Sequence, residues 1–190
     1  FGICLQENRM RQLFLTIPLS ESWQQSIQDW IHLQPNYFPW IVSEKRHITV
    51  QYLGSISDED IPAMVEELQS VYCRIPSFFL TLFSVCPFPS TNPRMIWAKV
   101  KQSPSFSNLV TFSRQTTNLY VLERPEEGVP LPHITLSRLG GQYDLTDLSF
   151  PTSRMRSPMM HVKRVELWET VRTQRGKQYE VLNSFYLEAT

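Results

Sequence analysis

The octets HITVQYLG (residues 47–54) and HITLSRLG (residues 133–140) are the most informative stretches of this 190-residue sequence. They agree at their histidine, isoleucine, threonine, leucine and glycine positions, and 86 residues separate the two histidines. That separation is too long for one local motif. We therefore interpret the octets as the same strand, which occurs once in each half of the molecule and predicts two related lobes.

Each octet begins with a tetrad, His-Ile-Thr followed by an aliphatic residue. In a strand, this tetrad places two functional side chains on one face. Because strand residues i and i+2 point the same way, His47 and Thr49 share a face, as do His133 and Thr135. Two imidazoles that titrate near about pH 6.5 can act as a base and an acid. Two hydroxyls can donate hydrogen bonds to an oxyanion such as a phosphate. One tetrad alone would be explained most simply as a buried strand with a structural histidine, whereas the repeated tetrad favours a catalytic site.

The two tetrads resemble the signature motifs of the two-histidine (2H) phosphoesterases. The context is similar to the bacterial branch named RNA 2',3'-cyclic phosphodiesterase or 2'-5' RNA ligase. Four further stretches carry the resemblance: QLFLTIPL (12–19), CPFPSTNPRMIWAKV (86–100), ERPEEGVPLPHITLSR (123–138) and VELWETVRTQRGKQYEVLNSFYL (165–187). It therefore covers nearly the whole chain and implies a single bilobal domain over residues 1–190.

The remaining pattern predicts an α+β fold. Helices are expected after Ser20 and Ser103, which can cap them, and after Ser57, which together with Asp60 resembles a capping box. Besides the strand that begins at residue 133, we expect strands over 11–19, 45–53, 78–85, 95–100, 161–173 and 178–187. Gly54 should end the first tetrad strand, and Arg175 and Gly176 should form a hairpin turn. The resemblance implies two pseudo-symmetric lobes, each an antiparallel sheet with helices packed outside, that face a central catalytic groove.

Composition limits the partners and the chemistry. Lysine plus arginine equals aspartate plus glutamate at 18 each, which weighs against a general duplex binder and allows a short RNA end or a nucleotide. Cys4, Cys73 and Cys86 match no metal or redox spacing and are interpreted as free thiols in a reducing cytoplasm. We find no membrane-length apolar run, no metal-ligand cluster and no glycine-rich phosphate loop. No metal or cofactor is expected.

The resemblance implies hydrolysis of RNA 2',3'-cyclic phosphate ends to 2'-phosphomonoesters, by a monomer whose partners are RNA ends or nucleotides. An in-line displacement needs a base for the water and an acid for the leaving oxygen, hence two histidines. The resemblance assigns the base to His133 and the acid to His47, with Thr49 and Thr135 on the phosphate. Two alternatives remain open. An RNA 5'-hydroxyl in place of water would form a 2'-5' linkage, and an inert site would leave an RNA-end-binding module.

Two further residues are carried over from the family. Arg138 would contact the phosphate and Tyr52 would stack on a nucleobase. The alternatives are an exposed cation at Arg138, which the family match makes the weaker interpretation, and a core aromatic at Tyr52. Both residues lie an odd number of steps beyond the histidine of their octet, so alternation places them on the wrong face. A bulge, a twist or a strand end must turn Arg138 into the groove. Trp97 also matches a family position and is interpreted as mainly structural.

Overall fold

The computed structural model describes residues 9–122, 128–141, 143–150, 157–174 and 176–189. Cys4 and Arg175, on which two of the sequence predictions fall, lie outside these residues. The main sheet has seven strands in the order β4-β5-β6-β2-β1-β8-β9, and its pairings are antiparallel. Its strands are β1 (Met10–Pro18), β2 (His47–Ser57), β4 (Leu82–Phe88), β5 (Met95–Val100), β6 (His133–Arg138), β8 (Arg164–Thr173) and β9 (Gly176–Tyr186).

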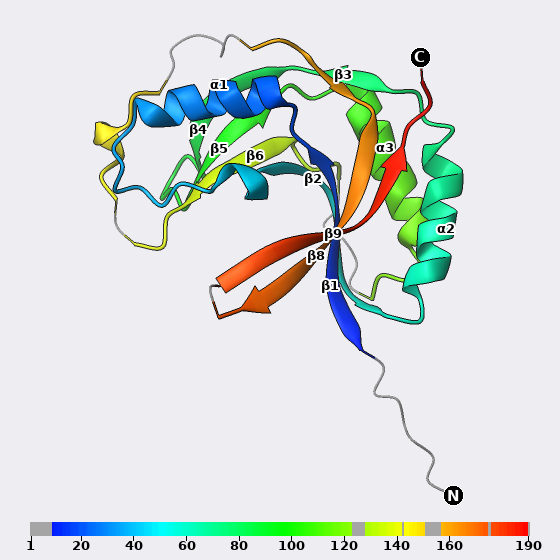
Figure 1. The fold of residues 1–190 in the computed structure, drawn as a ribbon. Helices are drawn as coiled ribbons and strands as arrows, with labels where there is room; N and C mark the ends of the chain where they lie inside the picture. The colour runs from blue at the N-terminus through cyan, green and yellow to red at the C-terminus, as the bar shows by residue number, and fades with distance from the viewer. Residues whose placement is uncertain (1–8, 123–127, 142, 151–156, 175, 190) are drawn as a thin grey trace, which may run out of the picture.

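Three α-helices and a small second sheet cover the main sheet. Figure 1 shows the main sheet strongly curled, with α1 (Glu21–His32) on one side and the pair α2 (Ile61–Tyr72) and α3 (Pro104–Thr117) on the other. β3 (Phe78–Leu80) and β7 (Met160–Val162) form the second sheet. No helix among the described residues is long and apolar enough to cross a bilayer. The predicted α+β fold with antiparallel strands and outer helices is confirmed.

α1 and α3 begin where their predicted caps place them. α2 does not begin at a Ser57 capping box, because β2 runs to Ser57 and the residue before the helix, Asp60, makes no side-chain capping hydrogen bond. Ser20 caps α1 by accepting a hydrogen bond from the Trp23 amide, and Ser103 caps α3 through the Phe106 amide. α1 buries one face composed of Trp23, Ile27, Trp30 and Ile31. This burial ties each helix to the sheet, because the apolar face of a short helix is stabilised mainly by tertiary packing.

Three predicted strand boundaries were wrong. The strands predicted over 78–85 and 161–173 each divide in two, at Thr81 and Lys163, where the chain leaves the small sheet for the main one. β2 does not stop at Gly54 but continues to Ser57. Gly54 has a φ of 72° next to a register shift opposite Leu13 and Phe14, so it accommodates an irregularity rather than a strand end.

The two lobes are related strand–helix–strand units within one continuous sheet. β1–α1–β2 forms the first unit and β5–α3–β6 the second, and in each unit the two strands pair directly. The units join where Ile48 of β2 pairs with Ile134 of β6. These isoleucines occupy the same tetrad position and the strands are antiparallel, so the pairing behaves as a local two-fold axis. The two predicted sheets are thus the two halves of one curled sheet.

The same irregularity follows both tetrads. In β2, Thr49 pairs with Thr16 and Gln51 with Leu15, which leaves Val50 as an extra residue. In β6, Thr135 pairs with Trp97 and Ser137 with Ile96, which leaves Leu136 as the extra residue.

The matching irregularities have the same effect on side-chain direction. Two consecutive residues are buried in each strand, and the next residue, Tyr52 or Arg138, is exposed. A β-bulge of this kind shifts the alternation by one residue. It therefore supplies the turn toward the groove that the sequence required.

Candidate active site

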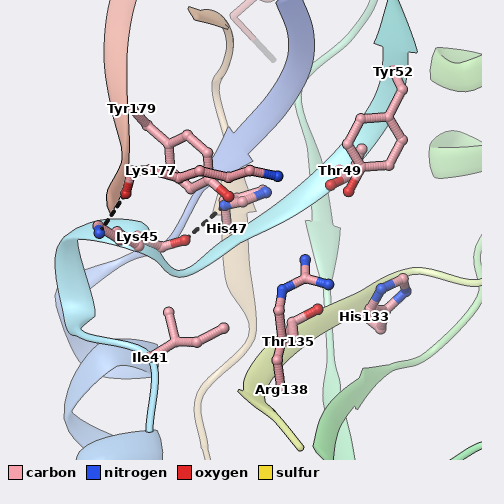
Figure 2. Close-up of a pocket in the computed structure, with 10 residues that line it drawn as sticks. All are labelled: Ile41, Lys45, His47, Thr49, Tyr52, His133, Thr135, Arg138, Lys177 and Tyr179. Carbon is pink, nitrogen blue, oxygen red and sulfur yellow. Dashed lines mark hydrogen bonds between the residues drawn. The ribbon is translucent and has the colours of Figure 1, made fainter. Parts of the chain in front are cut away.

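A cavity of about 220 Å³ lies where the two tetrad strands meet, and β9 forms one of its walls (Figure 2). It contains all six of the site residues predicted from the sequence. The lining residues are Ile41, Lys45, His47, Thr49, Tyr52, His133, Thr135, Arg138, Lys177 and Tyr179. The fold therefore brings together side chains from both halves of the chain, 86 residues apart in their tetrads.

Both histidines are held in the same way. His47 Nδ1 lies 2.8 Å from the carbonyl oxygen of Lys45, and His133 Nδ1 lies 2.8 Å from the carbonyl oxygen of Leu131. A carbonyl only accepts hydrogen bonds, so each Nδ1 carries a hydrogen and donates it. Each neutral ring then has an unprotonated Nε2, which can accept a proton or, once protonated, donate one. The two imidazoles, on β2 and β6, thus have the same tautomer, and each has an Nε2 free for proton transfer.

His47 is enclosed by aromatic rings. Its ring centroid lies 5.2 Å from that of Phe14, 5.1 Å from Trp168 and 5.5 Å from Tyr179. Burial lowers the pKa of His47 to about 4, the Lys45 carbonyl partly opposes this, and the charges of Arg138 and His133 lower the pKa further. His47 is therefore neutral at pH 7 in the ligand-free site.

His133 is supported by a stack of rings. Trp97 lies parallel to it with centroids 3.6 Å apart, and Phe88 lies on the other face of Trp97 at 3.5 Å. Burial lowers the pKa of His133, the Leu131 carbonyl opposes the shift, and the Arg138 charge adds to it. Trp97 thus has the structural role that the sequence predicted, and its contact fixes the plane of one candidate catalytic ring.

Thr49 and Thr135 present free hydroxyls. Figure 2 shows both side chains at the cavity between the two histidines. Within the described ranges, neither hydroxyl has a hydrogen-bond partner in the protein. An unpaired hydroxyl beside a cavity is available to donate to a bound oxyanion.

The cavity is cationic. Arg138, Lys45 and Lys177 line it, and no aspartate or glutamate among the residues that the structure describes does. The Arg138 guanidinium lies 3.7 Å from the Met95 sulfur, and among the described residues it pairs with no carboxylate. The described part of the chain also contains no group of three or more His, Cys, Asp or Glu side chains that could hold a metal ion. A planar guanidinium without an internal partner suits a phosphate group.

Comparison with known proteins finds similar phosphoesterases. Residues 17–97 match the family described as LigT-like phosphoesterase, a segment that includes the first tetrad. The RNA 2',3'-cyclic phosphodiesterase of Thermotoga maritima is 26% identical over 149 residues, which cover 75% of this chain and 76% of that protein. The enzyme of the same name from Aquifex aeolicus is 23% identical over 154 residues, covering 78% and 81%.

Solved structures share the fold. The protein TT0787 of Thermus thermophilus superimposes with a TM-score of 0.81 at 20% identity, covering 94% of this chain and 98% of that one. E. coli LigT complexed with 3'-AMP has a TM-score of 0.77 at 21% identity, covering 94% and 99%. The match over residues 17–97 and these shared folds make the chain similar to LigT-like phosphoesterases, in agreement with the resemblance that its tetrads carry.

A second hollow of about 550 Å³ adjoins the cationic cavity. It shares Thr49, Tyr52 and His133 with the first cavity and is otherwise largely apolar. Its other lining residues are Val50, Gln51, Leu53, Gly54, Phe88, Trp97, Arg114, Val121, Pro130 and Leu131. The site therefore has a cationic compartment and an apolar one, with Tyr52 and His133 between them.

Sequence reasoning missed four residues of the cationic compartment, namely Ile41, Lys45, Lys177 and Tyr179. Lys177 and Tyr179 share a face of β9 by alternation, which the sequence could have revealed. Nothing in the sequence shows that β9 reaches the tetrads, because its own pairing partner is β8. Burial raises the pKa of the Tyr179 phenol, so Tyr179 remains a neutral hydrogen-bond donor at pH 7.

Proposed function

We propose that this protein hydrolyses RNA 2',3'-cyclic phosphate ends to 2'-phosphomonoesters without a metal ion. The observation that carries the proposal is the pair of imidazoles, each fixed through Nδ1 by a backbone carbonyl, beside one cationic cavity. The names of the Thermotoga and Aquifex relatives support the substrate class. The 3'-AMP bound to E. coli LigT supports a nucleotide ligand.

The proposed reaction is one in-line displacement at phosphorus. His133 Nε2 removes a proton from water as the water oxygen bonds to phosphorus. The bond from phosphorus to O3' breaks, and His47 Nε2 donates a proton to O3'. The products are a 2'-phosphomonoester and a free 3'-hydroxyl, and the two imidazoles exchange protonation states. Each proton transfer of this kind contributes about 10²- to 10⁴-fold in rate.

The bound substrate prepares the acid. His47 is neutral in the ligand-free cavity because its pKa is lowered to about 4. A cyclic phosphate carries one negative charge, and a nearby negative charge raises the pKa of an imidazole. In this proposal the substrate anion therefore raises the pKa of His47. The imidazole then takes up from solvent the proton that it later gives to O3'.

The other predicted residues bind the substrate. Thr49, Thr135 and Arg138 donate hydrogen bonds to the phosphate oxygens, where fixed donors stabilise developing charge. The terminal base lies in the apolar hollow against Tyr52, an exposed ring that lines both compartments. Stacking of a base on an aromatic side chain is worth roughly 1–3 kcal/mol.

The proposal extends to the domain organisation, the oligomeric state and the cellular compartment of the protein. Residues 1–190 act as one bilobal domain and as a monomer, since one chain supplies the tetrads and the β9 wall of the cavity. The protein works in the cytoplasm, where the free thiols of Cys73 and Cys86 remain reduced.

The test is product analysis with an oligonucleotide that ends in a 2',3'-cyclic phosphate, in excess EDTA, with and without a 5'-hydroxyl oligonucleotide. The expected product in both reactions is the 2'-phosphomonoester, distinguished from the 3'-isomer by phosphorus NMR. A 2'-5'-linked product as the main species would make ligation the principal activity. Binding without turnover would indicate an RNA-end-binding module, and activity restored only by added Mg²⁺ or Zn²⁺ would contradict metal independence.

A further inference from the structure

We propose that Lys45 and Lys177 form a subsite for the phosphate on the 5' side of the terminal nucleotide. This inference rests on the proposed function, and it adds a substrate preference and a strand direction. RNA ends, or nucleotides with a 5'-phosphate, would be hydrolysed in preference to cyclic nucleotides with a free 5'-hydroxyl.

The two ends of the catalytic cavity differ in chemistry. In Figure 2, Lys45 and the backbone of Lys177 lie at one end, Thr49, Tyr52 and His133 lie at the other, and Arg138 lies between. In this view the Lys177 side chain extends from its end toward His47. The apolar hollow adjoins the second end, because the residues that it shares with the cavity are Thr49, Tyr52 and His133. A base placed against Tyr52 leaves the lysine end for the rest of the nucleotide.

Lys45 holds the lysine end together. Its Nζ donates a hydrogen bond of 2.7 Å to the carbonyl oxygen of Lys177, which lies 132 residues along the chain. The contact joins the 3-10 turn before β2 (Ser43–Lys45) to the start of β9. Lys45 thereby fixes the backbone from which the Lys177 side chain points into the cavity (Figure 2).

The positive charge at this end has no internal counterpart. Among the residues that the structure describes, the Lys177 ammonium has no hydrogen-bond or ion-pair partner, and Lys45 uses one of three N–H groups. No carboxylate of the described residues lines the cavity, although acidic and basic residues are equal in number over the chain. This local excess of cations favours an anion.

The reacting phosphate does not need these lysines. It already has two threonine hydroxyls, the Arg138 guanidinium and, once His47 is protonated, the His47 imidazole as donors at the centre of the cavity. The next anion in an RNA end is the phosphodiester on the 5' oxygen of the same nucleotide. With the base on the Tyr52 side, that phosphodiester reaches the lysine end and the strand leaves the site over β9.

The experiment compares kcat/KM for adenosine 2',3'-cyclic phosphate with and without a 5'-phosphate. Wild-type protein should prefer the 5'-phosphorylated substrate by about tenfold, the factor expected for a charge-assisted hydrogen bond. Lys177→Gln should reduce this ratio to near one, and Lys177→Arg should preserve it. Lys101→Gln, at an exposed lysine that lines neither compartment, is the matched control and should leave the ratio unchanged.

Two results would overturn the subsite. One is equal kcat/KM for the two substrates with wild-type protein. The other is an equal loss on both substrates with Lys177→Gln, which would place Lys177 on the reacting phosphate or in a structural role.

A binding measurement separates failure of the subsite from failure of the proposed function. If wild-type protein hydrolyses neither substrate, the proposed function fails, and calorimetry with adenosine 3',5'-bisphosphate and 3'-AMP tests the subsite alone. Tighter binding of the bisphosphate that is lost in Lys177→Gln would support the subsite. Equal affinities for the two ligands would contradict it.

Discussion

The two tetrad strands share their backbone geometry and differ in their surroundings. Each histidine donates Nδ1–H to the carbonyl two residues earlier, and each threonine is followed by the same bulge. After the bulge, however, β2 presents Tyr52 and β6 presents Arg138. The repeated geometry supplies a matched pair of imidazoles. In the proposed function, the differing residues after the bulges divide base binding from phosphate binding.

The rings around the two histidines differ as well. Three aromatic side chains surround His47, whereas His133 lies against one face of Trp97. Both environments remove water from an imidazole, which favours its neutral form and lowers its pKa. The pKa of His47 falls to about 4, so the three-ring enclosure desolvates its imidazole strongly.

Removing either imidazole tests whether the pair works as a unit. His47→Ala and His133→Ala should each lower kcat on a cyclic-phosphate oligonucleotide by about 10²- to 10⁴-fold, the worth of a general acid or base. Circular dichroism and thermal melting should show that both variants remain folded. His32→Ala, at the exposed end of α1, is the matched control and should retain full activity. Near-full activity in either tetrad variant would rule out the two-histidine mechanism.

A substrate with an activated leaving group separates the acid from the base. A nitrophenyl phosphodiester needs little protonation of its leaving oxygen, so the variant that lacks the acid should recover part of its rate. We expect His47→Ala to recover and His133→Ala to remain impaired, measured by nitrophenolate release. Recovery of His133→Ala alone would reverse the assignment. Recovery of neither would mean that both rings serve chiefly to hold the phosphate.

Much of this site could be predicted from the sequence because the tetrad chemistry is local. Alternation alone places His and Thr on one face. The parity of Arg138 required a bulge, a twist or a strand end, and the structure contains a bulge at Leu136. The breaks at Thr81 and Lys163 could not be predicted. These breaks depend on which of the two sheets each strand joins, and no local sequence pattern indicates the sheet. Lys177 was missed for the same reason, since the curl of the sheet brings β9 to the tetrads.

Replacing Arg138 and replacing Tyr52, the two residues after the bulges, should change different kinetic parameters. Arg138→Ala should lower kcat/KM by about 10- to 100-fold, because a charged hydrogen-bonding partner of the phosphate is lost. Tyr52→Ala should mainly raise KM, by about tenfold, because stacking binds the ground state and the transition state alike. Tyr52→Phe is the matched control and should retain the stacking. Steady-state kinetics on one cyclic-phosphate dinucleotide measures all three variants, and an equal kcat loss in both alanine variants would contradict the division of roles.

The smallest expected effect is a difference between the two titrations. Imidazole proton NMR of the ligand-free protein should show His47 titrating near pH 4, below His133, whose pKa is also lowered. Arg138→Gln should raise both pKa values, because the Arg138 charge lowers each of them. Inorganic phosphate should raise at least one pKa in the wild-type protein. Equal titration of both rings near about 6.5, the value of an unperturbed histidine, would contradict the desolvation argument.

The same shift makes folding stability depend on pH with a definite sign. The pKa of His47 is lower in the folded protein than in the unfolded chain, so the unfolded chain binds more protons below about pH 6.5. The stability associated with a neutral His47 is therefore complete above that pH and is lost as the pH falls toward 4. Urea denaturation at pH 7 and pH 4.5 measures the loss, which should be smaller in His47→Gln than in wild type. Equal losses would mean that the folded state does not disfavour the charged imidazole, and the acid would then need no substrate anion to acquire its proton.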